Sequence, residues 1–227
     1  NMDLTSPRTI RNIQEQFGFT FKKGLGQNFL TARNILEEIV DAAEIESGVI
    51  EVGPGFGVLT SELAQNSDKV VTIEIDERLI DVLDYTLAEY DNVKIINEDI
   101  LKLDLKKVID DEFNGEKVSI AANLPYYITT PIITKLLEEK LPIKNIVVMV
   151  QKEVAERMSA KPSTKDYGAI TVLCQYYTEP SIVANVPASL FVPPPKVDSA
   201  VLKLKVLDKP SVEVKDEGVF FRVVKAA

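Results

Sequence analysis

The feature that most constrains the fold of this chain is a regular alternation between short, β-rich apolar runs and segments with helical periodicity. The predicted strands span residues 48–52, 69–73, 93–96, 118–122 and 144–150. Between them, apolar residues recur at three- and four-residue spacing, which predicts amphipathic helices at residues 34–43, 59–65, 78–88 and 132–139. Strands and helices that alternate in this way form a mostly parallel sheet covered on both faces, so we expect an α/β domain.

The sequence changes character after the fifth predicted strand. A polar loop at residues 159–166 and a helix at residues 169–176 are followed by two apolar runs, at residues 181–186 and 199–206. Prolines lie between these two runs, and proline at such a junction blocks the extension of a hydrogen-bonded ladder. We therefore expect the two runs to form an antiparallel pair that completes one edge of the sheet.

Composition excludes several classes of site. The chain has 227 residues, 45% of them hydrophobic, which is enough for a full core. It contains no histidine, which excludes histidine triads, histidine proton shuttles and most transition-metal sites, and we expect no metal. The single cysteine, Cys174, excludes an internal disulfide and lies in an apolar run, where we expect an inert core thiol. No apolar run is long enough for a membrane span and no signal peptide is evident, so we expect a soluble, cytoplasmic protein.

Positive charge is unevenly distributed along a chain whose net charge is −9. That net charge argues against a uniformly basic surface. Two groups of basic residues nevertheless stand out, one before the first predicted strand and one after the fifth: Arg8, Arg11, Lys22 and Lys23, and Lys152, Arg157, Lys161 and Lys165. They form either a one-sided basic rim or ordinary solvated surface.

The most informative motif is Asn-Leu-Pro-Tyr-Tyr at residues 123–127, directly after the predicted strand at residues 118–122. A carboxamide, a backbone stiffened by proline and an aromatic ring are the parts needed to hold an amino-substituted base. The amide and peptide oxygens accept hydrogen bonds from an NH2 group, and the ring offers a face for stacking. The motif therefore indicates chemistry on a nucleobase.

A glycine-rich turn, residues 51–57 (Glu-Val-Gly-Pro-Gly-Phe-Gly), follows the first predicted strand. Glycine lets the backbone pass close to a ligand at the carboxyl end of a parallel sheet. The spacing is Gly-x-Gly-x-Gly, and Pro54 removes a backbone donor that a pyrophosphate would use, which weakens a dinucleotide interpretation. A simple tight turn is the alternative.

Two acidic residues follow the next two predicted strands. Glu74 lies 74 − 53 = 21 residues after Gly53, where a carboxylate can accept both ribose hydroxyls of an adenosine ligand. Asp99 could accept from an adenine amino group. Either residue alone is more often a cap or a turn residue. Together with the glycine turn and Asn123, however, they occupy four strand ends on one edge of the sheet, which indicates a shared site.

Seven segments carry a resemblance to a known family: residues 27–30, 51–57, 74–76, 98–99, 123–128, 151–155 and 191–199. Together they resemble the small-subunit ribosomal RNA adenine dimethyltransferases, the KsgA (RsmA) family. The resemblance implies a class I S-adenosylmethionine-dependent methyltransferase with a Rossmann-like fold, which dimethylates N6 of two adjacent adenosines in a hairpin near the 3′ end of small-subunit (16S) ribosomal RNA. It also implies a role in small-subunit biogenesis, with the RNA of the 30S subunit or its precursor as partner. We expect a monomer.

The resemblance implies roles for individual residues. The side-chain oxygen of Asn123 and the carbonyl of Leu124 accept hydrogen bonds from the N6 amino group, which draws its lone pair toward the methyl group. Tyr126 stacks on the base, and Phe191 holds its other face. Core packing is the alternative for Phe191 and for Tyr127. No histidine is needed, because the sulfonium is an excellent leaving group and the proton can leave later to water.

The predicted site residues fall into three groups. The catalytic residues are Asn123, Leu124, Pro125, Tyr126 and Phe191. The residues that bind S-adenosylmethionine, and S-adenosylhomocysteine as product, are Asn28, Leu30, Gly53, Gly55, Glu74, Ile75, Asp99, Ile100 and Asn123. The residues that contact RNA are Lys22, Lys23, Lys152 and Arg157.

The resemblance also divides the chain. Residues 1–21 would be an N-terminal basic segment, residues 22–207 the methyltransferase domain, and residues 208–227 the start of a C-terminal helical domain. The sequence stops at what resembles that domain's first helix, so we expect the domain to be largely absent, with cofactor binding retained and activity on the natural particle weakened.

Two other functions remain open. One is a large-subunit (23S) ribosomal RNA adenine N6-methylase that confers antibiotic resistance, although residues 129–131 and 191–199 favour the small-subunit family. The other is a ribosome assembly factor for which methylation is secondary.

Overall fold

The structure, a computed structural model, describes residues 2–19, 28–161 and 168–212, together with residues 217, 218, 220 and 222. The side chain of Tyr126 is not described. Lys22, Lys23 and Lys165 of the two predicted basic groups lie outside the described residues.

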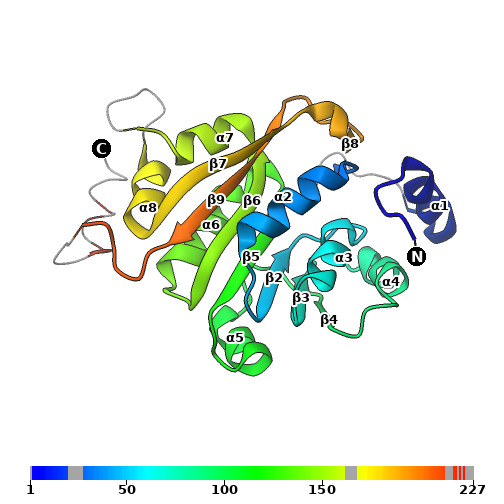
Figure 1. Cartoon of the computed structure of the whole chain (residues 1–227), viewed down its shortest axis with the longest axis horizontal. Helices are drawn as coiled ribbons and strands as arrows, with labels where there is room; N and C mark the ends of the chain where they lie inside the picture. The colour runs from blue at the N-terminus through cyan, green and yellow to red at the C-terminus, as the bar shows by residue number, and fades with distance from the viewer. Residues whose placement is uncertain are drawn as a thin grey trace.

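A seven-stranded sheet forms the centre of the protein, with the strand order β4-β3-β2-β5-β6-β9-β7 (Figure 1). Its parallel strands are β2 (Gly48–Val52), β3 (Lys69–Ile73), β4 (Val93–Ile96), β5 (Val118–Asn123) and β6 (Ile143–Gln151). The strands β9 (Ser199–Val206) and β7 (Thr178–Val186) extend it beyond β6 in antiparallel orientation. The predicted parallel sheet and its antiparallel edge pair are thus confirmed.

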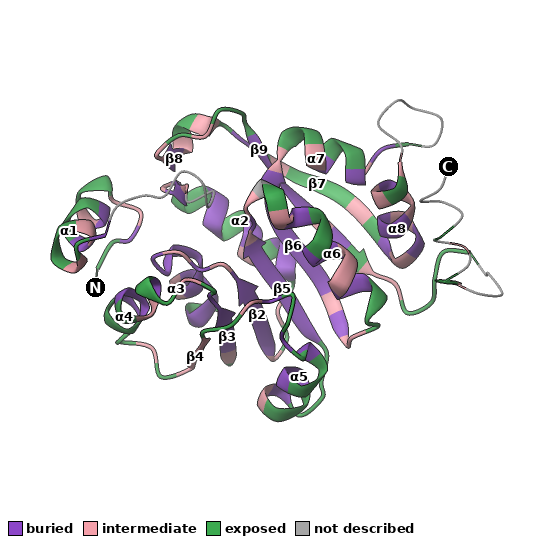
Figure 2. Ribbon diagram, turned by 180° about the vertical axis from the view of Figure 1, so that it is seen from behind, coloured by how far each residue is buried: buried purple, intermediate pink, exposed green. Residues whose placement is uncertain are grey.

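Helices cover both faces of this sheet. One core cluster joins the sheet to α1 (Pro7–Phe17), α2 (Arg33–Ala43), α3 (Val58–Gln65) and α4 (Arg78–Thr86). The other joins it to α5 (Leu105–Phe113), α6 (Thr129–Glu138), α7 (Lys152–Met158) and α8 (Ala169–Tyr177). Successive strand residues point to opposite faces, so Val49 packs in the first cluster and Ile50 in the second. Figure 2 shows the inner strands of the sheet mostly buried between these two layers, whereas the edge strands β4 and β7 are partly exposed.

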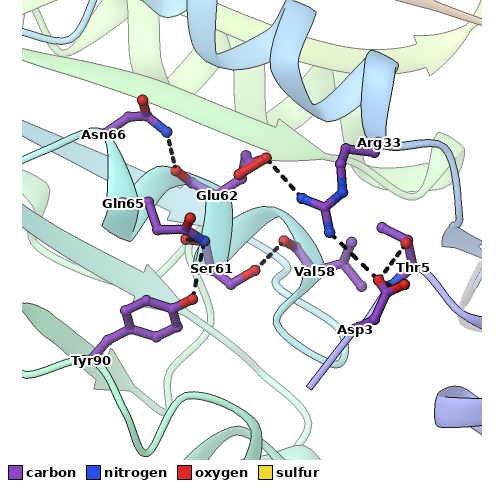
Figure 3. A network of polar contacts seen from close by, with 9 residues as sticks. All are labelled: Asp3, Thr5, Arg33, Val58, Ser61, Glu62, Gln65, Asn66 and Tyr90. Atoms are coloured by element: carbon purple, nitrogen blue, oxygen red, sulfur yellow. Dashed lines mark hydrogen bonds and ion pairs between the residues drawn. The ribbon is translucent and has the colours of Figure 1, made fainter. Parts of the chain in front are cut away.

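Helix α1 was not predicted. Residues 1–21 were expected only as a basic segment, yet Pro7–Phe17 is helical and buries Ile10 and Ile13 in the core while Arg8 and Arg11 stay exposed. A polar network ties the chain just before this helix to two other helices (Figure 3). In it, the guanidinium of Arg33 donates to Glu62 of α3 at 3.2 Å and to Asp3 at 3.5 Å. The division of the chain at residues 21/22 and 207/208 stays a prediction.

A small second sheet was also not predicted. It pairs β1 (Phe29–Leu30) with β8 (Phe191–Val192) in antiparallel orientation, with Leu30 opposite Phe191. Short 3₁₀ turns, η2 (Tyr126–Ile128) and η3 (Ala188–Leu190), precede α6 and β8. The small sheet brings residues 28–30 next to the carboxyl edge of the main sheet, where they line the same cavity as the ends of the parallel strands.

Two further expectations concern single features. Cys174 is fully buried, and burial raises the pKa of its thiol to about 12, which confirms an inert core residue. Within the described residues, no helix combines the length and the apolar character needed to cross a membrane.

Candidate active site

The site is a cavity at the carboxyl ends of the parallel strands, where open α/β sheets bind ligands. Eleven of the predicted site residues line it: Asn28, Leu30, Gly53, Gly55, Glu74, Ile75, Asp99, Ile100, Asn123, Leu124 and Pro125. They come from four strand ends and from the β1 segment, so residues that are far apart in sequence meet in one place.

The first part of the glycine turn, up to Gly55, lines this cavity. Gly53, Gly55 and Gly57 have φ angles of 72°, 57° and 92°, a region that favours glycine. A Cβ atom at position 55 would lie 2.8 Å from the ring of Phe29. That ring is itself stacked on Phe56, with the ring centroids 4.2 Å apart. The turn therefore brings bare backbone to the cavity next to an aromatic wall.

The cavity is acidic. Its lining carries five carboxyl groups and no lysine or arginine among the described residues: Glu51, Glu74, Asp76, Glu98 and Asp99. Asp76 is paired with Arg78, and the other carboxyl groups, when ionised, favour a cationic ligand over phosphate.

Glu74 lies directly after β3 and is 6% exposed. Its carboxylate accepts a hydrogen bond from the backbone N–H of Asp76 at 3.0 Å. Burial raises the pKa of Glu74 to about 7, and the neighbouring charge of Asp76 also raises it, against the opposing effect of local backbone N–H groups. A ligand that donates hydrogen bonds to this carboxylate would therefore stabilise its ionised form.

Glu51 is a buried carboxyl group to which the sequence analysis assigned no role. It lies in β2, is 1% exposed, and accepts hydrogen bonds on Oε1 from the hydroxyls of Thr60 and of Thr72, the latter at 2.8 Å. Burial raises its pKa to about 7 against the opposing effect of both hydroxyls. The sequence did indicate a buried polar contact at this position, since a glutamate inside an apolar strand needs buried hydrogen-bond partners.

Asn123 is the last residue of β5, and its side chain is oriented by the β1 segment. Its Nδ2 donates to the backbone carbonyl of Asn28 at 3.5 Å. With the amide nitrogen used in this way, Oδ1 is the atom left to accept a hydrogen bond, and the described residues supply it with no donor.

The backbone after Asn123 is held from two sides. The N–H of Leu124 donates to the carbonyl of Met149 in β6 at 3.2 Å. The hydroxyl of Thr129, which is buried at the start of α6, donates to the carbonyl of Pro125 at 3.0 Å. These bonds fix the path of the motif, so its acceptor oxygens keep a defined position at the cavity.

The aromatic residues predicted for the site differ in burial and in position. Phe191 is 3% exposed, packs in the core cluster of α1–α4, and does not line the cavity. Tyr127, for which core packing was the alternative, is 53% exposed and lines the cavity. The side chain of Tyr126 lies outside the described part of the structure, so its stacking role stays a prediction.

Two predicted RNA-contacting residues are described. Lys152 and Arg157 both lie on α7, which directly follows β6, and both are exposed. Arg157 contacts Glu153 one turn earlier at 3.4 Å, an exposed pair with little expected effect on stability. Among the described residues, no group of three or more carboxylate, thiol or imidazole side chains could hold a metal ion.

The fold and the cavity define a class of protein. A mostly parallel sheet in this strand order, with a glycine turn after β2 and an acidic site at the carboxyl ends of its strands, is the arrangement of the class I S-adenosylmethionine-dependent methyltransferases. More narrowly, the chain belongs to the ribosomal RNA adenine dimethylase family, whose model matches residues 18–227.

Individual relatives agree with this assignment. Proteins named ribosomal RNA small subunit methyltransferase A from Bacillus mycoides and Bacillus cereus are 55% identical over 99% of this chain and 78% of their own length. A dimethyladenosine transferase from Plasmodium falciparum has a similar structure, with a TM-score of 0.70, 35% identity, and coverage of 79% of this chain and 64% of that one. The 23S ribosomal RNA methyltransferase ErmE also reaches a TM-score of 0.70, with 30% identity over 88% of this chain and 76% of its own.

Proposed function

We propose that this protein transfers methyl groups from S-adenosylmethionine to N6 of two adjacent adenosines in a hairpin near the 3′ end of small-subunit ribosomal RNA. The observation that carries the proposal is the oriented amide of Asn123 at the rim of an acidic cavity. An acceptor oxygen fixed beside a site for a cationic ligand is what N-methylation of an amine requires.

The residues of the cavity fit S-adenosylmethionine. The five carboxyl groups favour its sulfonium and ammonium charges, Glu74 can accept both ribose hydroxyls, and Asp99 can accept from its adenine amino group. Gly53 and Gly55 line the cavity without side chains, so a ligand can approach the backbone there. When bound, the cofactor supplies an activated methyl group, and S-adenosylhomocysteine is the product.

The protein's part in the reaction is to hold the target amine. Oδ1 of Asn123 and the carbonyl oxygen of Leu124 accept hydrogen bonds from the two N–H groups of the adenosine amine. These hydrogen bonds turn the nitrogen lone pair toward the methyl group. S-adenosylmethionine held in the cavity would supply the methyl group to this nitrogen, S-adenosylhomocysteine would be the leaving group, and the methylated amine would lose a proton to water. Alignment carries the step, in keeping with a chain that has no histidine.

The target base must leave its stack to reach this pocket. We propose that Tyr126 stacks on the base once it is there. Phe191 is buried opposite Leu30, so in this conformation it supports the cavity wall rather than the base. Lys152 and Arg157, with Lys22 and Lys23, would contact phosphates of the RNA outside the acidic cavity.

The biological setting follows from the same proposal. The substrate would be the RNA within the 30S subunit or its precursor, the protein would act as a monomer in the cytoplasm, and methylation would belong to small-subunit biogenesis. Similarity to ErmE keeps a large-subunit methylase as the second candidate. The higher identity to the small-subunit relatives over almost the whole chain favours the first.

One experiment tests cofactor, target atom and substrate together. Unmethylated small and large subunits are incubated with the protein and with cofactor labelled on its methyl group, and the RNA is digested to nucleosides. We expect N6,N6-dimethyladenosine from small subunits only. Label in large subunits would favour the second candidate. Particle binding and subunit maturation that survive complete loss of transfer in Asn123→Ala would favour an assembly factor.

A further inference from the structure

Tyr127 is an exposed aromatic residue at the edge of the active-site cavity. Its side chain is 53% exposed and lines the cavity that also contains Asn123. Large apolar side chains this exposed are uncommon in the described part of the chain. Ile75, which follows β3 and also lines the cavity, is 64% exposed. The cavity lining therefore includes two exposed apolar side chains beside its carboxyl groups.

The local backbone holds Tyr127 outward. It is the middle residue of η2, and successive side chains of a 3₁₀ turn point about 120° apart. Ile128 packs against the core, and Thr129 is buried and tied to the Pro125 carbonyl. Because the turn is anchored by these two residues, the direction of the Tyr127 side chain is set by the scaffold and not by a flexible loop.

The charge of the site decides what this ring can hold. RNA phosphates are disfavoured beside this lining, which among the described residues has no lysine or arginine. Of its five carboxyl groups, Glu51 and Glu74 have a pKa of about 7 and Asp76 is paired with Arg78, which leaves Glu98 and Asp99 as the acidic lining residues with no ion pair among the described residues. A nucleobase carries no charge, and its flat face gains from stacking on an aromatic ring whatever its sequence. An RNA segment that enters here is therefore better held by its bases than by its backbone.

We propose that Tyr127 is a stacking platform for a second nucleobase, that of a nucleotide next to the adenosine being methylated. The inference rests on the proposed function, in which two adjacent adenosines are substrates. While one occupies the pocket beside Asn123, the base of its neighbour can stack on an exposed aromatic surface next to that pocket. Tyr127 supplies that surface and so helps the enzyme to act on adjacent bases.

The first test is kinetic. Tyr127→Ala should raise the KM for unmethylated small subunits roughly tenfold, the size expected for loss of one stacked base, and leave the Kd for S-adenosylmethionine unchanged. Tyr127→Phe keeps the ring and should behave as the wild type. Ile182→Ala removes a side chain that is 40% exposed on the edge strand β7, away from the cavity, and serves as the control for loss of exposed apolar surface.

The second test reports stacking directly. A hairpin RNA with 2-aminopurine beside the target adenosine is titrated with each variant in the presence of S-adenosylhomocysteine. Fluorescence should fall on binding to the wild type, Tyr127→Phe and Ile182→Ala, and fall much less at saturation with Tyr127→Ala. The inference would be overturned if Tyr127→Ala quenched the fluorescence as much as the wild type does, or if its KM for small subunits were unchanged. It would also be overturned if the substitution raised the Kd for the cofactor and not the KM. Absence of methyl transfer by the wild type would instead reject the proposed function.

Discussion

The side-chain amide of Asn123 donates to the backbone carbonyl of Asn28 across 95 residues of sequence. This hydrogen bond joins the end of β5 to the segment that enters β1, and both line the same cavity. The β1 segment therefore contributes to the cavity wall and also fixes which end of the Asn123 amide faces a substrate.

Replacement of Asn123 tests this arrangement. Asn123→Ala should lower kcat by about 10²–10³-fold, the cost of losing one preorganised polar group, with a small change in cofactor affinity. Asn123→Asp keeps an acceptor oxygen but cannot donate to Asn28, so it should retain more activity than the alanine variant. Labelled methyl transfer and thermal unfolding of both variants provide the check. Similar rates for the wild type and Asn123→Ala would show that another group holds the amine.

The glycine turn offers a matched pair of substitutions. Gly55 and Gly18 have similar φ angles of 57° and 62°, so alanine should cost about 1–2 kcal/mol of backbone strain at either position. At Gly55 the new Cβ also meets Phe29 at 2.8 Å, whereas at Gly18 nothing lies within 4 Å. Gly55→Ala should therefore weaken cofactor binding and Gly18→Ala should not, as measured by calorimetry. Equal effects on cofactor affinity would refute a role for the Phe29 wall.

Glu74 should make cofactor binding depend on pH. Its pKa is raised by burial to about 7, so in the free protein the carboxyl is largely protonated below pH 7 and ionised above it. Ribose hydroxyls donate to the ionised form, and the Kd for S-adenosylmethionine should rise about tenfold from pH 8 to pH 6. Glu74→Ala and Glu74→Gln should bind weakly at both pH values. A pH profile that is the same in the wild type and in Glu74→Gln would assign the titration to another group.

Much of the sheet could be predicted, because buried parallel strands are continuous apolar runs between turn residues. The predicted bounds of β2, β3 and β4 are those of the structure, while β5 is longer by one residue at its end and β6 is longer by one residue at each end. Helix ends were less predictable, since they depend on capping. The helix predicted at residues 78–88 ends at Thr86, and α6 begins at Thr129 because η2 leads into it.

Helices α1, α5 and α7 were missed although two of them carry clear signals. Pro7 stands at the first position of α1 and Gly18 caps its end, and Asp104 caps α5 by accepting from the backbone N–H of Lys107. The small β1–β8 sheet lacked any such signal, because two-residue strands so far apart carry no periodicity. The burial of Phe191, for which core packing was the alternative prediction, depends on that pairing.

The position of the site followed from topology, because parallel strands end at one edge. The pKa values of its carboxyl groups, in contrast, could not be predicted from the sequence. The raised pKa values of Glu51 and Glu74 come from burial, which depends on the packed helices and not on local sequence.

RNA binding should depend on salt through α7. The double variant Lys152→Ala/Arg157→Ala should lower affinity and reduce the slope of log K against log salt by roughly 0.7–0.9 for each RNA phosphate that is no longer neutralised. The control is Lys106→Ala on α5, where the side chain is 74% exposed on a different helix. Binding measured at several salt concentrations separates the variants. A slope equal to that of the wild type would show that other residues neutralise the RNA phosphates.

Glu51 should make the free protein less stable as pH rises. Its folded pKa of about 7 lies above the ordinary value of 4.5, so its contribution to the free energy of unfolding is fully present below pH 4.5 and is lost as pH rises through 7. This rise in pKa corresponds to at most about 3 kcal/mol of the free energy of unfolding. Glu51→Gln keeps an oxygen for Thr60 and Thr72, and it should unfold at a higher temperature than the wild type at pH 8 but not at pH 5. Glu37→Gln on the exposed face of α2 is the control. If Glu51→Gln lowered the unfolding temperature equally at both pH values, the carboxylate would be needed for packing and would carry no charge penalty.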